Sequence, residues 1–142
     1  MIILGIESSC DDTSVALVEH TTAGFKILSE KTASQIEIHK KYGGVVPEVA
    51  GRMHAEKILP LLQEVLKNQP TPDAIAVTSG PGLITGLIVG VEAARALSYL
   101  TKIPLVAVNH LTGHIHSMEI GEQKIIYPAL ALIASGGHTE IV

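Results

Sequence analysis

The sequence predicts an α/β fold, with a mixed sheet flanked by helices. Short apolar runs typical of strands come first, two long stretches with helical spacing follow, and a short apolar run comes after each of them. The chain has 142 residues, of which 46% are hydrophobic and 17% charged. That composition is enough to bury a core, and the length suits about one domain.

The first strands are predicted at residues 1–7 and 14–19, joined by the polar turn ESSCDDTS. Two such runs around a turn favour a hairpin. A third strand is expected at 25–32, and its charged outward residues favour a sheet edge. The turn is either a ligand-facing loop, which offers hydroxyl and N–H groups, or an ordinary polar turn.

A long helix is expected to begin at Pro47 and to end near Asn68, because apolar residues recur there at helical spacing. Proline suits the first turn of a helix. Pro60 lies inside the pattern, where it removes one backbone hydrogen bond, so we expect it to kink or split the helix.

Residues 73–79 are nearly all apolar and predict a central strand that is buried on both faces. A helix over 84–100 follows, and Gly82, Gly86 and Gly90 recur at a spacing of four. Each glycine weakens a helix by roughly 1 kcal/mol relative to alanine. The stripe therefore predicts that another backbone comes close, either in this chain's own sheet or in a partner subunit.

The clearest candidate site is a histidine pair after a predicted strand at 103–108. Asn109 can cap a helix, and His110 and His114 then lie on one helical face, directed at the same point. Neutral imidazole is a common transition-metal ligand. The pair thus predicts half of a metal site, and two surface or capping histidines are the alternative.

Near the C-terminus we expect a strand at 127–134, an SGG turn at 135–137 and the start of another strand at 140–142. The turn's N–H groups can hold an anion. These strands would lack a sheet of their own and begin a second lobe, so we expect a boundary between 1–122 and 123–142. Unpaired apolar strands favour self-association.

Composition excludes several classes of function. The net charge is −4 without a basic cluster, so the chain alone has no electrostatic hold on nucleic acid. Its single cysteine, Cys10, rules out an internal disulfide and fits a reducing compartment. We find no signal peptide and no apolar run long enough for a membrane. We therefore expect a cytoplasmic protein that does not bind membranes.

The predicted order of elements is typical of an actin-like N-terminal lobe, of the sugar kinase and heat-shock ATPase type, followed by the first strands of a truncated second lobe. In such folds two similar lobes flank a nucleotide cleft.

Five motifs in the same order resemble the N-terminal part of the bacterial tRNA threonylcarbamoyladenosine transferases, the TsaD family. They are LGIESSCDDTSVA at 4–16, HKKYGGVVPEVAGRMH at 39–54, TSGPGLITGLIVG at 78–90, VNHLTGHIHS at 108–117 and LIASGGHTEIV at 132–142. The resemblance implies transfer of a threonylcarbamoyl group from threonylcarbamoyl-adenylate to the tRNA adenosine next to the anticodon.

The resemblance also implies site residues. His110 and His114 would bind iron or zinc, and the first hairpin turn, with Glu7, Asp11 and Asp12, would face the same cleft. Asp11 or Asp12 would accept a proton or order a water, with turn capping as the alternative. The donor would lie on the SGG turn and the strand before it, at Ile133, Ala134, Ser135, Gly136 and Gly137. Family members continue for roughly as long again, with an aspartate ligand that this chain lacks.

The implied partners are a TsaB-like paralogue, paired through helices of the N-terminal lobe, a TsaE-like ATPase, and tRNA as substrate. The chain alone would be inactive. The alternative is a non-catalytic, TsaB-like pairing subunit or scaffold lobe, which would lack the histidine pair. A sugar kinase or related ATPase is a third hypothesis, although such folds usually have aspartate where Glu7 stands.

Overall fold

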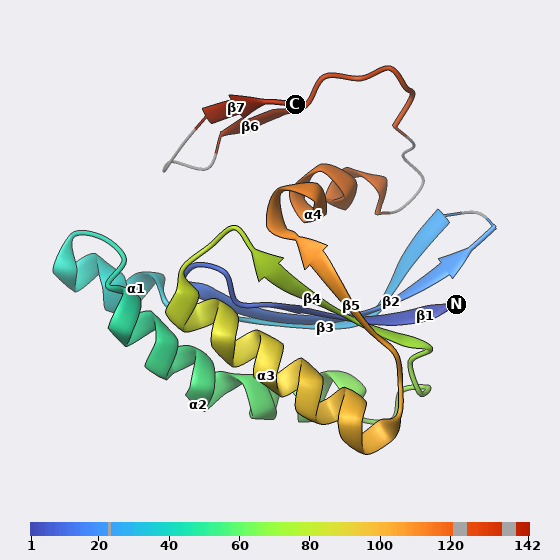
Figure 1. Ribbon diagram of the computed structural model, residues 1–142, viewed down its shortest axis with the longest axis horizontal. Coiled ribbons are helices and arrows are strands. Elements are labelled where there is room, and N and C mark those ends of the chain that lie inside the picture. Colours follow the sequence, from blue (N-terminus) through green and yellow to red (C-terminus); the bar gives the residue numbers. More distant parts are fainter. Residues whose placement is uncertain (23, 121–124, 135–138) are drawn as a thin grey trace.

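The computed structural model describes residues 1–22, 24–120, 125–134 and 139–142. Over these residues the chain forms a five-stranded sheet and a separate two-stranded sheet. Two long helices cover one face of the larger sheet, and a short helix lies on the opposite side (Figure 1). The predicted α/β class, with a mixed sheet flanked by helices, is confirmed.

The larger sheet has the strand order β3-β2-β1-β4-β5. Its first three strands form an antiparallel meander, β4 runs parallel to β1, and β5 runs parallel to β4. Both the predicted hairpin and the third strand at a sheet edge are therefore confirmed. The strands are β1 (Ile2–Glu7), β2 (Asp12–Thr21), β3 (Gly24–Ser34), β4 (Ala74–Gly80) and β5 (Leu105–Asn109).

After β3 come the short helices α1 (Ile36–His39) and η1 (Lys40–Tyr42), and then α2 (Pro47–Leu66). Pro47 begins α2 as predicted, but Pro60 does not split it. Pro60 lies on the exposed side of the helix, where water can bind the carbonyl that has lost its N–H partner.

The glycine stripe lies along α3 (Ile84–Thr101) and the turn before it. A Cβ atom on Gly82, Gly86 or Gly90 would come within 3.0 Å of Ser8 or Ser9, in the segment that follows β1. The closely packed neighbour is therefore the segment of this chain that directly follows β1. Contacts within the chain are enough to explain the stripe, and a further contact with a partner subunit stays a prediction.

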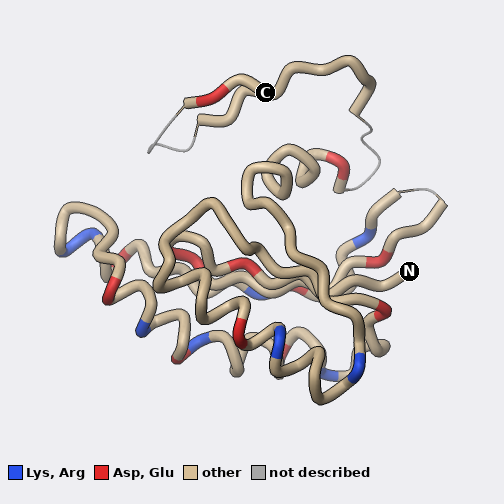
Figure 2. The backbone as a smooth tube through the Cα atoms, viewed as in Figure 1, with Lys and Arg blue, Asp and Glu red and all other residues tan. Residues whose placement is uncertain are grey.

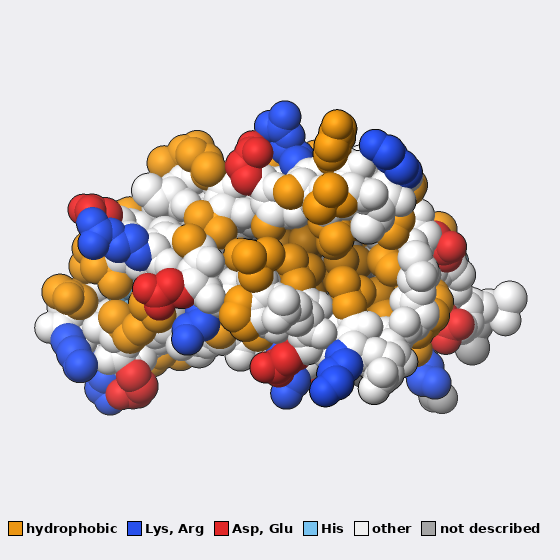
Figure 3. All heavy atoms as spheres, turned by 90° about the horizontal axis from the view of Figure 1, so that it is seen from below, with side chains coloured by type: hydrophobic (Ala, Val, Ile, Leu, Met, Phe, Trp, Pro, Cys, Tyr) orange, Lys and Arg blue, Asp and Glu red, His pale blue; other side chains and the backbone are white. Residues whose placement is uncertain are grey.

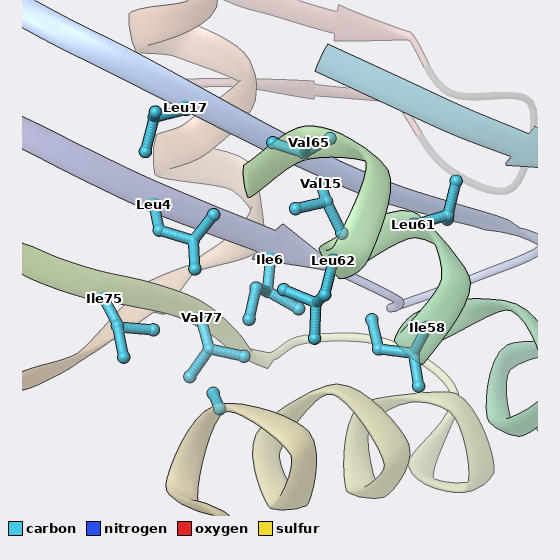
Figure 4. Close-up of a cluster of buried hydrophobic side chains, with 11 residues drawn as sticks. Leu4, Ile6, Val15, Leu17, Ile58, Leu61, Leu62, Val65, Ile75 and Val77 are labelled. Atoms are coloured by element: carbon cyan, nitrogen blue, oxygen red, sulfur yellow. The ribbon is translucent and has the colours of Figure 1, made fainter. Parts of the chain in front are cut away.

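The hydrophobic core lies between the sheet and the helices α2 and α3 (Figure 4). Alternate residues of β1 and β2 point into it, as expected for strands with one buried face. β4 is central, as predicted, but its alternate residues Ala74 and Ala76 are only half-buried, so it is not buried on both faces. The cluster contains Leu4, Ile6, Val15, Leu17, Ile58, Leu61, Leu62, Val65, Ile75, Val77 and Ala94.

The C-terminal strands β6 (Leu132–Ala134) and β7 (Thr139–Ile141) pair with each other in antiparallel register. The expectation that they lack a sheet is therefore wrong, because each strand satisfies backbone hydrogen bonds of the other. The strand predicted at 127–134 is also shorter than expected. Both strands are largely exposed, apart from the buried side chain of Ile133.

Charges of both signs alternate along α2 and α3 in the described part of the chain (Figure 2).

By length and composition alone, α3 is long and apolar enough to cross a membrane, contrary to our expectation of no such run. Here, however, its residues Gly86, Leu87, Gly90 and Ala94 are buried in the fold, and Glu92 forms an exposed ion pair with Arg95.

Candidate metal centre

The candidate site is built on α4 (His110–His116), which begins directly after β5. The Asn109 side chain accepts hydrogen bonds from the backbone N–H groups of Leu111 and Thr112, at 2.9 and 3.3 Å. This is the predicted N-cap, and it satisfies two of the amides that a helix start leaves without partners. The cap fixes the helix so that His110 occupies its first position.

The two histidines converge as their spacing predicts. Their Nε2 atoms are 3.1 Å apart, and the ring centroids are 4.4 Å apart in an edge-to-face arrangement. Two nitrogen ligands bonded to one tetrahedral zinc ion would be about 3.3 Å apart. The pair therefore fits two positions of a metal site. Among the described residues, no group of three or more potential ligands meets at one point.

A carboxylate, that of Glu7 at the end of β1, lies beside this pair. Its carboxylate accepts hydrogen bonds from the Ser9 N–H and the Thr78 hydroxyl, and Oε2 lies 3.1 Å from His110 Nδ1. Burial acts to raise the pKa of Glu7. Hydrogen bonds from Ser9, Thr78 and His110 outweigh that effect and hold the pKa below its usual value. Glu7 is therefore ionised at neutral pH.

These groups line a cavity of about 700 Å³, next to the loop between β1 and β2. Asp11 and Asp12 lie on its wall with both histidines, so the structure brings these four predicted residues together. Asp12 Oδ1 is buried and has no hydrogen-bond partner among the described residues. An acceptor left without a donor is costly, so Oδ1 is suited to a ligand that supplies one. The lining consists of Glu7, Ser9, Cys10, Asp11, Asp12, Ser14, Pro81, Gly82, Leu83, His110 and His114.

A fully buried histidine on α2, His54, contacts the loop between β1 and β2 that lines the cavity. His54 Nδ1 lies 2.8 Å from the Thr13 hydroxyl, and Nε2 lies 3.1 Å from the Cys10 carbonyl oxygen. With Nε2 donating to the carbonyl and Nδ1 accepting from the hydroxyl, a neutral ring satisfies both contacts. Sequence reasoning missed this residue, because nothing in its local pattern indicates a partner that lies more than forty residues earlier.

The Cys10 thiol lines the cavity but is not activated. Desolvation and the adjacent Asp11 carboxylate, with a further contribution from Asp12, raise its pKa to about 11. Because a thiolate is the nucleophilic form, Cys10 does not provide a nucleophile at neutral pH.

The other predicted site residues belong to the C-terminal segment, which the structure describes only in part. Ile133 and Ala134 are on β6 and are not part of the cavity lining, so their contact with substrate stays a prediction. Ser135, Gly136 and Gly137 lie outside the described residues. His116, on the same helix as the histidine pair, is hydrogen bonded to Glu119 at 2.6 Å.

Solved structures share this fold. YeaZ from Pseudomonas aeruginosa superposes with a TM-score of 0.54 at 23% identity, over 77% of this chain and 45% of that one. An uncharacterized protein with similarity to peptidase YEAZ, from the same organism, gives 0.59 at 20% identity, over 99% and 63%. These likenesses concern the fold alone, and they agree with the actin-like lobe that the element order predicts.

Sequence comparison is more specific. The family model for TsaD, tRNA N6-adenosine threonylcarbamoyltransferase, matches residues 26–142. Relatives named tRNA N6-adenosine threonylcarbamoyltransferase are 51% identical in Bacillus subtilis and 48% identical in Carboxydothermus hydrogenoformans. Each match covers 99% or more of this chain but 41–42% of the relative, so the chain spans about two fifths of their length. The chain belongs to the TsaD family of tRNA N6-adenosine threonylcarbamoyltransferases.

Proposed function

We propose that this chain is the N-terminal lobe of a two-lobed tRNA N6-adenosine threonylcarbamoyltransferase, an enzyme of the cytoplasm. In this proposal residues 1–122 form the lobe, and residues 123–142 begin a second one. The observation that carries the proposal is the pair of His110 and His114, whose Nε2 atoms lie 3.1 Å apart at a cavity shared with Asp11 and Asp12.

His110 and His114 would hold one divalent ion, iron or zinc, with further ligands from outside the residues described here. Imidazole nitrogen suits both metals. When bound, the ion would supply Lewis acidity that polarises and positions the carbamoyl carbonyl of threonylcarbamoyl-adenylate.

The carboxylates of the cavity would accept the proton that the acceptor amine loses. The acceptor is the exocyclic amine of the tRNA adenosine, which loses a proton as its nitrogen bonds to the carbamoyl carbon and AMP leaves. Asp11 or Asp12 would take that proton or order a water that does, and Asp12 Oδ1, which has no partner in the described part of the chain, supports this role. The strand residues Ile133 and Ala134, with Ser135, Gly136 and Gly137, would bind the donor.

Partners follow from charge and exposed surface. With a net charge of −4, the lobe needs other parts of the complex to hold the tRNA phosphates. Hydrophobic side chains gather on the face formed by α2 and α3 (Figure 3). Such a face supports pairing with a TsaB-like paralogue, next to a TsaE-like ATPase, and self-association is the competing use. The exposed large hydrophobic side chains of α3 are Ile84, Ile88, Tyr99 and Leu100.

The test is a chimera in which this chain replaces the matching N-terminal part of the Bacillus subtilis relative. Purified chimera, with its partner proteins and tRNA, should form threonylcarbamoyladenosine, and His110→Ala with His114→Ala should abolish the product. Activity that survives both substitutions would favour the alternative, a non-catalytic pairing subunit or scaffold lobe. The 142-residue chain alone should bind metal weakly and show no turnover.

A further inference from the structure

The contacts of Glu7 determine which nitrogen of His110 carries a proton. Glu7 Oε2 accepts from the Thr78 hydroxyl and also lies 3.1 Å from His110 Nδ1. An ionised carboxylate accepts hydrogen bonds and donates none. His110 Nδ1 must therefore be the donor in this contact.

The other nitrogen of the ring is then fixed by elimination. A neutral imidazole has a single N–H group, so a proton on Nδ1 leaves the lone pair on Nε2. Nε2 is the atom that faces His114 Nε2 at 3.1 Å. The Ser9 hydroxyl, 3.0 Å from His110 Nδ1, does not oppose this arrangement, because a hydroxyl can accept as well as donate.

We propose that Glu7 is a positioning residue, which holds His110 in the Nδ1–H tautomer and so directs its Nε2 lone pair to a divalent metal ion. The inference rests on the proposed function, since it assigns Glu7 a role in metal binding by His110 and His114. A metal-bound histidine commonly donates its second N–H group to a carboxylate, which fixes the ring and raises its basicity. In this chain β1 supplies that carboxylate from more than one hundred residues earlier in the sequence.

The decisive variant is Glu7→Gln, which keeps the size of the side chain. With its oxygen accepting from the Ser9 N–H, the amide places its NH₂ group towards Thr78 and His110. The Thr78 hydroxyl can turn and accept, whereas His110 can accept at Nδ1 only if its proton moves to Nε2. The substitution should therefore reverse the tautomer.

Two measurements on the 142-residue chain test this. In the metal-free chain at about pH 8, where imidazole is neutral, ¹⁵N chemical shifts should place the His110 proton on Nδ1 in the wild type and on Nε2 in Glu7→Gln. Zn²⁺ titration should give affinity about 10- to 100-fold lower in the variant. Glu119→Gln is the matched control, because Glu119 contacts His116 Nδ1 in the same way outside the cavity. It should change neither value.

The outcomes separate the two proposals. A wild-type His110 protonated on Nε2 would overturn the role of Glu7, and that measurement needs no variant to fold. Unchanged Zn²⁺ affinity in Glu7→Gln would also overturn the role of Glu7 if His110→Ala still weakens Zn²⁺ binding. The proposal that His110 and His114 bind the metal would then stand. If His110→Ala leaves Zn²⁺ affinity unchanged, His110 and His114 do not bind the metal, and both proposals are wrong.

Discussion

Gly86 in α3 is a position where one added methyl group should disturb the fold. A Cβ atom there would lie within 3.0 Å of the Ser8 carbonyl oxygen and 3.0 Å from the His54 ring. The carbonyl belongs to the backbone and cannot rotate away, so either α3 or the loop after β1 must move. Gly86→Ala should therefore destabilise the chain.

The size of the effect follows from three contributions. Alanine favours a helix by about 1 kcal/mol over glycine. Against this, forcing a methyl group into a packed region typically costs about 1–3 kcal/mol. Moving α3 also disturbs the buried hydrogen bond of 2.9 Å that the Ser8 hydroxyl donates to the Gly86 carbonyl, and a buried group left unpaired costs about 1–3 kcal/mol. The net loss should be about 2–3 kcal/mol, or roughly 8–12 °C in Tm.

Urea and thermal unfolding, followed by circular dichroism, measure this loss. Gly113 is the matched control, because it lies within α4 and a Cβ atom there would meet nothing within 4 Å. Gly113→Ala should leave stability unchanged or raise it by up to about 1 kcal/mol. If Gly86→Ala were as stable as Gly113→Ala, the segment after β1 could not lie against α3 as described.

Three further predictions concern the cavity. Asn109→Ala removes the cap of α4, so it should lower the free energy of unfolding in urea by about 1 kcal/mol and weaken Zn²⁺ binding. A Zn²⁺ affinity equal to that of the wild type would show that the cap does not align the histidines. Cys10, with its pKa raised to about 11 from the usual 9.0, should be alkylated by iodoacetamide at pH 8 about 100-fold more slowly than an unperturbed thiol, and Asp11→Asn should speed the reaction. Because the pKa of Glu7 is lower in the folded chain than the usual 4.5, Glu7 should contribute stability that is fully present above the unfolded-state pKa and lost as the pH falls through the folded-state pKa. In urea unfolding at acidic pH, Glu7→Gln should lack this part of the acid dependence.

Local patterns were sufficient for most of the fold. Short apolar runs predict β1 and β2, and helical spacing predicts α2 and α3 with ends close to those observed. Of the two effects expected of Pro60, a split of α2 does not occur, because Pro60 lies on the exposed side of the helix, which spacing alone did not settle. The pairing of β6 with β7 was missed because short exposed strands carry little periodic signal.

The glycine stripe shows where sequence reasoning reaches its limit. Helical spacing of Gly82, Gly86 and Gly90 correctly indicates a close approach, but it says nothing about which backbone approaches. The neighbour is the segment with Ser8 and Ser9, more than seventy residues away in the sequence. Only the packing of α3 against the end of β1 identifies it.

The candidate site likewise contains one contact that local spacing predicts and one that it does not. His110 and His114 are one helical turn apart, so local spacing predicts that they meet. The acceptor at His110 Nδ1 has no such local signal. The family resemblance places Glu7 in the same cleft, yet neither spacing nor composition predicts which ring atom it contacts.

That contact follows from topology. β1 ends at Glu7, Thr78 lies near the end of β4, and β5 ends at Asn109, directly before His110. Because β1, β4 and β5 are parallel neighbours, their carboxyl ends meet at one edge of the sheet, where open α/β folds bind ligands. An antiparallel β4 would carry Thr78 to the opposite edge and leave the Glu7 carboxylate without that donor. The parallel order of these strands is therefore what places an ionised acceptor beside His110 and leaves its Nε2 directed at His114.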